Sequence, residues 1–523
     1  MVISCAFDTL GKKPNLYLLL HNSKQDPINP HDGKGNHMEF SGLELFLDDQ
    51  MISNTRNMCR RITRPRLYEG NPVVRREYPW EAGHACIYGS VLYDDHKKLF
   101  RMWYNAYGED YYNQQVMAYA ESPDGITWTK PMLDVRPWPG YERTNILMGP
   151  QINLHGPGLL INPDQSDTQR RYLMLFDSYP HWRPNATELG IHGRQLYAAE
   201  SPDGIHWSPD MGRPAFAGKA DSGQSVVWDP ITKTFKAYVR MTIEDAFGQR
   251  IRGSRLVESP DFVHWGPPRE LMRTDDVDGY PDAQIQQLCV TRLDGIYVGL
   301  LSMFQIQQYV HGTERRKEGG GGLFEGAQVS EIQLVTSRDG VHFTRVADRS
   351  LFMAQADRGG FGTHGYTTAS QMLQHDDTVY IYCDGRMCDP DDPDWIKQGM
   401  EIGLATMPRD RFVALQPKRM MDEAMVELVP MQFPQARLLL NATTSAAGQI
   451  RAELADFNGV TIKGFEHNKS VMMTGESLDH QIFWQADGKT YMHDALPPNM
   501  RDQPIRLRLW LRQAHIHALR ASS

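Results

Sequence analysis

The sequence has no long hydrophobic run. Its longest apolar stretch, Leu16 to Leu20, is far shorter than the ~20 residues that a transmembrane helix needs. The first residues also lack a basic region followed by an apolar run of ~7–15 residues, the pattern of a secretory signal peptide. We therefore expect no membrane partner and a cytoplasmic location by default, with a secreted or periplasmic location left open.

Long blocks of basic residues are absent as well. Lysine and arginine number 55 against 64 aspartates and glutamates, which gives a formal net charge of −9. Because nucleic acids and anionic lipid surfaces are bound mainly through clustered Lys and Arg, neither is expected as the main partner. An uncharged or mildly cationic ligand fits this balance better.

Cysteine is scarce, and the commonest catalytic motifs are missing. The six cysteines are scattered, and the only close pair, Cys383 and Cys388, matches neither a zinc ribbon nor a redox C-x-x-C. The sequence also lacks a G-x-x-x-x-G-K-[ST] loop, a Rossmann fingerprint, H-E-x-x-H and G-x-S-x-G. These absences exclude the commonest nucleotide-binding, metalloprotease and serine-hydrolase classes.

What the sequence does contain is a repeated turn motif, S-x-D-G-x-x-W. Its aspartates, including a fifth degraded copy, lie 58 to 79 residues apart and are Asp124, Asp203, Asp261, Asp339 and Asp410. In this motif the aspartate can accept hydrogen bonds from backbone N–H groups two residues on, the glycine supplies a left-handed conformation, and the tryptophan packs between sheets. The interval is that of a four-stranded sheet with its loops.

Short alternating runs precede every copy of the motif, and two more lie upstream of each. Four strands in each of five units predict an all-β chain with a five-bladed β-propeller. At 523 residues the chain is also too long for one core. We expect a poorly ordered arm over 1–40, the propeller over 41–415, a linker over 416–426 and a C-terminal β-sandwich over 427–523. One hypothesis places the natural start of translation at Met38.

The sequence resembles a known group of enzymes in its turn motifs, in the order of propeller and sandwich, and in local runs such as Pro79-Trp80-Glu81 and Arg170-Arg171-Tyr172. These are the five-bladed propeller glycoside hydrolases, above all the invertase and fructanase relatives and more loosely the arabinanase and xylosidase relatives. The resemblance covers about residues 40–523. The Asn-Asp-Pro-Asn, Arg-Asp-Pro and Glu-Cys motifs of true invertases are absent, which indicates a distant branch.

Candidate catalytic residues stand just before the first strand of each predicted blade. These strand ends and the loops between second and third strands share one face of a propeller, where ligands usually bind. Glycoside cleavage needs one carboxylic acid and a second carboxylate as nucleophile or base, and a third can orient the sugar. We predict Glu81, Asp221 and Asp282 for these roles. The alternative is that they cap backbone N–H groups in turns.

Further polar and aromatic residues at the same face are candidates for binding substrate. They are Trp80, His84, His155, Gln224, Arg240, Tyr280, His364, Tyr366, Asp384 and Arg386. The histidines can bond sugar hydroxyls or coordinate an ion, and the arginines suit a substrate carboxylate or sulfate. No metal ligand is assigned and no cofactor is required, although a structural cation in the channel is left open.

The resemblance and the carboxylates together predict a glycoside hydrolase that cleaves an oligo- or polysaccharide in the propeller funnel, with exo action. The alternatives are a non-catalytic carbohydrate-binding propeller, or a polysaccharide lyase or transglycosidase on the same scaffold. A carbohydrate is the expected partner. A homo-oligomer is left open, with the glycine-rich loop over 305–330 as one contact candidate.

Overall fold

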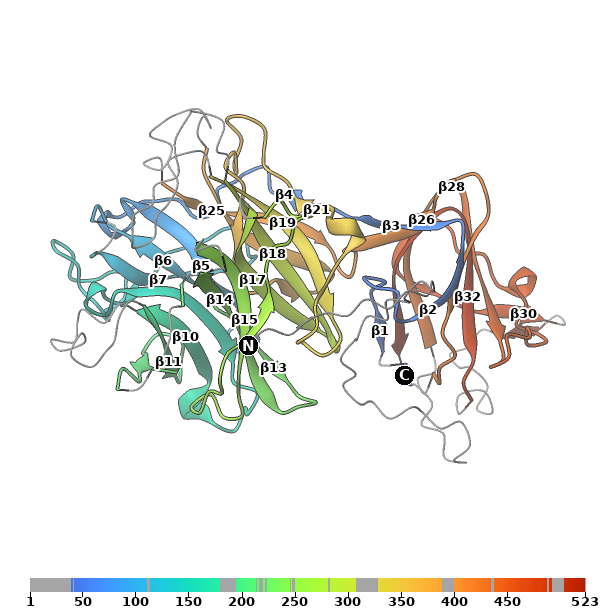
Figure 1. Ribbon diagram of the computed structural model, residues 1–523, viewed down its shortest axis with the longest axis horizontal. Coiled ribbons are helices and arrows are strands. Elements are labelled where there is room, and N and C mark those ends of the chain that lie inside the picture. Colours follow the sequence, from blue (N-terminus) through green and yellow to red (C-terminus); the bar gives the residue numbers. More distant parts are fainter. Residues whose placement is uncertain are drawn as a thin grey trace, which may run out of the picture.

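The computed structural model is almost entirely β, with 56% of the residues it describes in strands and 4% in helices. It shows a five-bladed propeller joined to a second β-rich part, so the predicted fold class is confirmed (Figure 1). The residues it describes are 39–40, 42–110, 113–178, 194–212, 214–215, 220–221, 223–244, 246, 250–280, 283–306, 328–387, 399–433, 437–486, 489–491 and 503–522. Within these ranges no helix is long and apolar enough to cross a bilayer.

Five antiparallel sheets form the propeller, one for each predicted blade. Blade one contains β5 (His84–Asp94), β6 (Leu99–Tyr107), β7 (Gln115–Ser122) and β8 (Ile146–Met148), and blade two contains β9 (Leu154–Ile161), β10 (Tyr172–Ser178), β11 (Gln195–Ser201) and β12 (Ser208–Pro209). Blade three contains β13 (Ser225–Asp229), β14 (Thr234–Glu244), β15 (Arg250–Ser259) and β16 (Arg269–Met272), and blade four contains β17 (Ala283–Leu293), β18 (Ile296–Ile306), β19 (Gln328–Ser337), β20 (Thr344–Arg345) and β21 (Leu351–Met353). Blade five contains β22 (Thr367–Thr368), β23 (Leu373–His375), β24 (Thr378–Gly385) and β25 (Glu401–Pro408). Apolar clusters fill the spaces between neighbouring blades.

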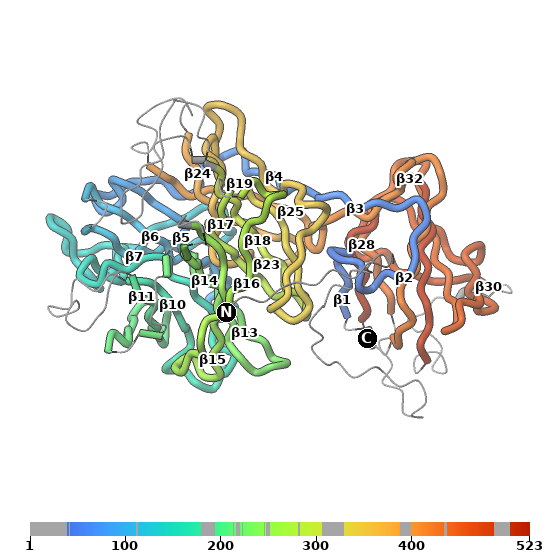
Figure 2. Tube along the Cα trace, in the orientation of Figure 1, coloured from blue at the N-terminus to red at the C-terminus, as the bar shows by residue number. Residues whose placement is uncertain are grey.

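Blade five is completed by a strand from the other end of the chain. Strand β4 (Arg66–Leu67) pairs with β25, with Thr406 opposite Arg66 and Ala405 opposite Leu67. The segment that carries β4 comes directly from the C-terminal part of the molecule, as Figure 2 shows. Hydrogen bonds between distant segments therefore close the ring.

The repeated motif forms the turn that the sequence predicts. In the first copy, Oδ1 of Asp124 accepts from the backbone N–H groups of Ile126 at 2.8 Å and Thr127 at 2.7 Å. Gly125 has φ of +75°, and a Cβ there would lie 2.9 Å from the hydroxyl of Tyr382. The tryptophan of the motif, Trp128, packs edge-on against the Tyr382 ring at 5.6 Å. Each turn thus ties its own blade to the preceding one.

The second part, which we call the C-terminal β-domain, is built from both ends of the chain. Its sheet runs in the order β2 (Ile52–Arg56), β27 (Ala424–Leu428), β32 (Arg506–Ser522), β26 (Val413–Pro417) and β3 (Met58–Ile62). Strand β1 (Leu43–Glu44) also pairs with β32. The long strand β28 (Arg437–Ala455) pairs with β32 and with β29 (Glu476–Gln481). The segment predicted as a linker, 416–426, overlaps β26 and β27.

Ion pairs and a shared core fix the C-terminal β-domain to blades four and five. Arg338 of the propeller contacts Glu44 at 3.0 Å and Asp48 at 2.9 Å. Arg520 contacts Asp410 at 2.7 Å. One hydrophobic cluster includes Val298 of blade four and Leu440 of the C-terminal β-domain. The predicted arm up to residue 38 and most of the glycine-rich loop, 307–327, lie outside the described residues.

We expect Asp203→Ala to lower the free energy of unfolding by about 2 kcal/mol, because Oδ1 of Asp203 accepts from the N–H groups of Ile205 and His206. Urea denaturation followed by tryptophan fluorescence measures this loss. The matched control is Asp134→Ala at an exposed position, which should change stability by less than ~0.5 kcal/mol. Equal losses in the two variants would contradict a structural role for the turn aspartates.

Candidate functional site

The first strands of all five blades begin at one end of the propeller channel, and the antiparallel second strands end there. Charged and polar side chains from these strand ends contact one another across the blades. We call them the channel cluster: Cys86, Tyr88, His155, Asp177, Arg194, Asp221, Arg240, Arg252, Gln286 and Asp384.

Blade two contributes a histidine and a carboxylate that face each other across β9 and β10. His155 and Asp177 are cross-strand partners, with Nδ1 and Oδ1 3.2 Å apart. Arg194 places Nη1 2.9 Å from the same Oδ1. Asp177 is fully buried, and its Oδ2 accepts no hydrogen bond from any residue that the structure describes. Oδ1 of Asp177 is therefore held by His155 and Arg194, whereas Oδ2 has no donor among the residues that the structure describes.

Blade three adds an ion pair beside them. Arg240, near the end of β14, is ion-paired with Asp221, whose side chain is 30% exposed while that of Arg240 is 4% exposed. The side-chain amide of Gln224 donates to the backbone oxygen of Asp221 at 2.7 Å. His155, Asp177 and Asp221 each bring one nitrogen or oxygen within 4.8 Å of the others. Blades two and three thus share one site.

Tyr88 connects the blades across the channel. It comes from β5, its ring lies 5.5 Å from the ring of His155, and its hydroxyl accepts from Nε2 of Gln286 in blade four at 3.3 Å. Arg252 of blade three donates to Oε1 of that Gln286 at 2.6 Å. Burial raises the pKa of Tyr88, so its hydroxyl keeps its proton and can donate it in a hydrogen bond.

Asp384 at the end of β24 forms the blade-five part of the cluster. Its carboxylate accepts from Sγ of Cys86 at 2.9 Å, the hydroxyl of Thr367 at 2.8 Å and the N–H of Ile87 at 2.5 Å. Burial raises the pKa of Asp384 to about 6, although these donors and Arg386 act in the opposite direction. A carboxyl group with this pKa exchanges its proton close to neutral pH.

The three histidines predicted at the strand starts are neutral at pH 7. Burial and then Arg386 lower the pKa of His84 to about 3 and that of His364 to about 4. Burial and then Arg194 lower the pKa of His155 to about 4. The backbone N–H of Met400 donates to Nδ1 of His84 at 2.9 Å, so the ring proton of this histidine is on Nε2.

Glu81, a predicted catalytic residue, lies among blade-one residues instead. Its fully buried carboxylate accepts from the hydroxyl of Tyr104 at 2.5 Å, the N–H of Glu77 at 2.8 Å and Nζ of Lys130 at 2.9 Å. Trp80 beside it is also fully buried and donates to Asn145 at 2.9 Å. Neither side chain contacts the channel cluster among the described residues. These contacts match the capping alternative for Glu81.

The remaining predicted residues lie at the same end of the propeller. Tyr366 is buried, and its hydroxyl donates to the backbone oxygen of Phe361 at 3.0 Å. His364 is buried, whereas Tyr280 and Arg386 are half-buried. Asp282 lies outside the described residues. The catalytic and binding roles given to these residues stay predictions.

The sequence did not point to six members of the cluster: Cys86, Tyr88, Asp177, Arg194, Arg252 and Gln286. A signal for Asp177 was present, because it ends a second strand as Arg240 and Asp384 do. The register pairs His155 with Asp177 in the same way that it pairs Thr367 with Asp384. The two missed arginines lie at the starts of third strands, a position that sequence reasoning did not consider.

The trio His155, Asp177 and Asp221 offers the nitrogen and oxygen ligands that divalent metals accept. Arg194 and Arg240, however, contact the two carboxylates of this trio. Guanidinium groups repel a cation and occupy oxygens that would bind it. The arrangement therefore favours a polar ligand over a resident metal, and the structural cation stays a prediction.

We expect the purified protein to hold much less than one equivalent of any divalent metal, because the arginines neutralise the carboxylates. Inductively coupled plasma mass spectrometry of protein dialysed without chelator measures this content. Asp177→Asn is the matched variant. About one equivalent of metal in the wild type that is lost in this variant would show a metal site and contradict the expectation.

Known structures are similar to this chain in fold, at low sequence identity. No protein-family model matches the sequence, and no curated protein is detectably similar to it. The structure is similar to an N-acetylgalactosamine deacetylase from F. plautii, with 12% identity over 68% of this chain and 96% of the other and a TM-score of 0.45.

Two further structures are similar to this chain. A β-1,2-mannobiose phosphorylase from Listeria innocua is 13% identical over 66% of this chain and 97% of its own, with a TM-score of 0.42. A β-fructofuranosidase from Schwanniomyces occidentalis is 11% identical over 88% and 97%, with a TM-score of 0.39.

Proposed function

We propose that this protein is a carbohydrate-active enzyme that cleaves a glycosidic bond at the channel cluster. The observation that carries the proposal is a set of buried polar atoms without hydrogen-bond partners among the described residues: Oδ2 of Asp177, Oε1 of Gln224 and Nε of Arg240. Two of these atoms accept and one donates. Sugar hydroxyls both donate and accept, so a sugar can satisfy all three.

The carboxylates of the cluster supply the groups that glycoside cleavage needs. Asp221 is the most exposed of them and contacts Arg240, a position that suits a nucleophile or base. Asp384 has the raised pKa of a general acid. Asp177, held by Arg194, is placed to accept hydrogen bonds from sugar hydroxyls. This set retains Asp221 from the sequence prediction and replaces Glu81 with carboxylates of the cluster.

Contacts across the channel support exo action. Tyr88 reaches from blade one to Gln286 of blade four and lies against His155 of blade two. A bridge of this kind blocks passage along the channel, so a polysaccharide enters by one end only. We therefore propose that the enzyme acts on terminal sugar residues.

Asp221→Asn should lower turnover by at least ~100-fold, because it removes the proposed nucleophile or base. Proton NMR of oligosaccharides and aryl glycosides incubated with the protein measures the products. Parallel incubations with inorganic phosphate separate hydrolysis, which gives a reducing sugar, from phosphorolysis, which gives a sugar phosphate. Asp134→Asn is the control at an exposed position.

A lectin-like propeller would give another result in the same experiment. Its polar atoms would bind a sugar, with saturation-transfer signals in both the wild type and the variant, but no product would form in either. That outcome would overturn the enzymatic proposal and leave carbohydrate binding standing.

The activity should fall as the pH rises through about 6, because Asp384 with its raised pKa loses the proton that a general acid must donate. Initial rates from pH 4 to 9 measure this fall, the alkaline limb of the pH–rate profile. Asp384→Asn should abolish it together with most of the turnover, whereas Asp134→Asn should leave it unchanged. An alkaline limb that persists in Asp384→Asn would assign the acid to another residue.

A further inference from the structure

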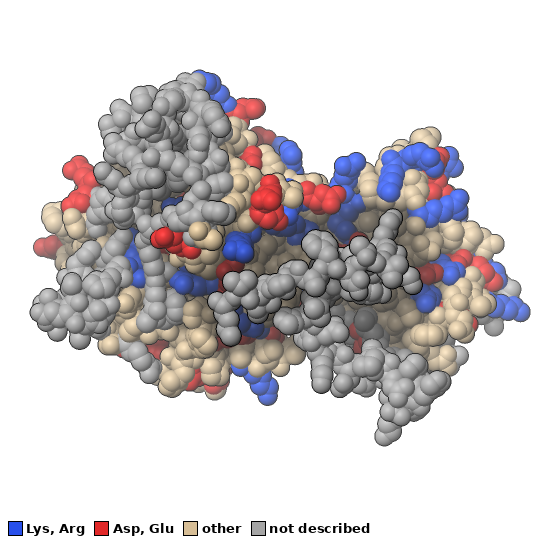
Figure 3. All heavy atoms as spheres, viewed as in Figure 1, with Lys and Arg blue, Asp and Glu red and all other residues tan. Residues whose placement is uncertain are grey.

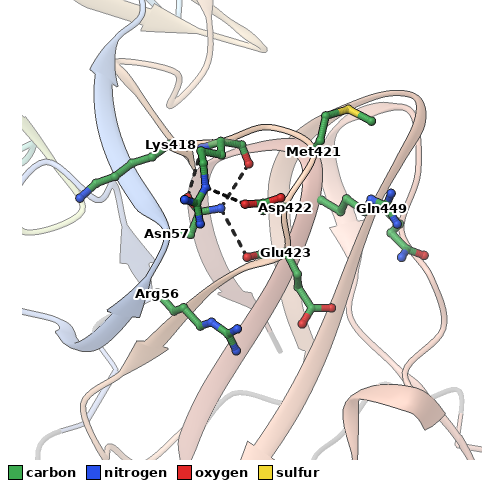
Figure 4. A pocket seen from close by; sticks show the side chains of 9 residues that line it. Arg56, Asn57, Lys418, Met421, Asp422, Glu423 and Gln449 are labelled. Carbon is green, nitrogen blue, oxygen red and sulfur yellow. Dashed lines mark hydrogen bonds and ion pairs between the residues drawn. The ribbon is translucent and has the colours of Figure 1, made fainter.

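A second hollow lies in the C-terminal β-domain, away from the propeller channel. Its volume is about 740 Å³, within the ~300–1,000 Å³ of ligand pockets. The turn between β2 and β3, the loop between β26 and β27, and strands β28 and β32 form its walls (Figure 4). It is lined by Arg56, Asn57, Lys418, Arg419, Met421, Asp422, Glu423, Gln449 and Arg512.

The charge of this hollow is opposite to that of the whole chain. Four of its residues are Lys or Arg and two are Asp or Glu, whereas the chain has a net charge of −9. Arg419 is paired with Asp422 at 2.6 Å. Arg56, Lys418 and Arg512 form no ion pair with any described residue and are exposed. Figure 3 shows Lys and Arg side chains gathered over the upper part of this domain.

Hydrogen bonds hold the walls of the hollow in place. The side-chain amide of Asn57 donates to the backbone oxygens of Arg419 at 3.2 Å and Glu423 at 3.4 Å, and its Oδ1 accepts from the N–H of Arg419 at 3.1 Å. The N–H of Lys418 donates to the backbone oxygen of Asn57 at 2.7 Å. The loop between β26 and β27 is thus tied to the β2–β3 turn, as Figure 4 shows. Because the hollow is preformed, less conformational freedom is lost when a ligand binds.

We propose that this hollow binds an acidic polysaccharide through its carboxylate or sulfate groups. The three cations supply charge, and the side-chain amide of Gln449 can bond hydroxyl groups. No aromatic side chain lines the hollow. Nucleic-acid bases and the faces of neutral sugars are usually held by stacking on aromatic rings, so an acidic sugar chain fits the hollow better. Binding here does not depend on turnover in the channel.

The test is affinity electrophoresis in gels that contain polygalacturonate, with dextran gels as the neutral reference. Wild-type protein should be retarded by polygalacturonate at low salt, and added salt should release it. The triple variant Arg56→Gln, Lys418→Gln, Arg512→Gln should bind at least about tenfold more weakly. The control Lys97→Gln, Arg136→Gln, Arg143→Gln removes the same charge at exposed propeller positions and should bind like the wild type.

Three results would overturn this inference: no retardation of the wild type, equal weakening in both triple variants, or equally tight binding to duplex DNA or to phosphatidylserine vesicles. Asp221→Asn should be retarded like the wild type. A protein that binds polygalacturonate but cleaves no glycoside refutes the proposed activity alone. A protein that cleaves a glycoside but runs freely in these gels refutes this inference alone.

Discussion

Closure of the propeller ring is the constraint on which the rest of the structure depends. The channel cluster exists only if strand ends from five blades meet around one axis. The pairing of β4 with β25 completes that circle, and it joins residues more than 300 positions apart. The segment that carries β4 also carries β2 and β3, which pair with β27 and β26. The same residues therefore close the propeller and attach the C-terminal β-domain to it.

The chemistry of the channel follows from burying arginines beside aspartates. Arg194 and Arg240 contact the carboxylates of Asp177 and Asp221 at the mouth of the channel. Burial, and then the arginines around the channel, lower the pKa values of His84, His155 and His364 and keep these rings neutral. Asp384 has hydrogen-bond donors but a more distant cation, so burial dominates and raises its pKa to about 6. Similar carboxylates thus have different surroundings: Asp177 and Asp221 contact arginines, whereas Asp384 is held by hydrogen-bond donors and has a raised pKa.

Local sequence predicted the blades well because the turn that defines them is local. Asp124 and Gly125 make their turn with neighbours a few residues away, and the motif repeats in each blade. The pairing of β3 with β26 could not be predicted in this way, since Ile62 and Val413 leave no shared pattern in the sequence. That pairing moves the segment around residues 43–62 into the C-terminal β-domain.

The members of the site could be predicted where the position of a residue along its strand is enough to bring it to the channel. Five predicted residues lie in or beside the channel cluster, as their positions at strand ends predicted: His155, Asp221, Gln224, Arg240 and Asp384. Glu81 has an equivalent position, but its side chain turns to cap the backbone of Glu77 and to bond Tyr104. The direction of a side chain in a short turn depends on such partners, which the sequence does not reveal.

The most direct test of the account is a crystal structure of the Asp221→Asn variant soaked with an oligosaccharide that the wild type cleaves or binds. The account predicts a terminal sugar in the channel, with hydroxyl oxygens within hydrogen-bond distance of Oδ2 of Asp177 and Nε of Arg240. A sugar bound elsewhere, with both atoms still lacking a partner, would contradict it.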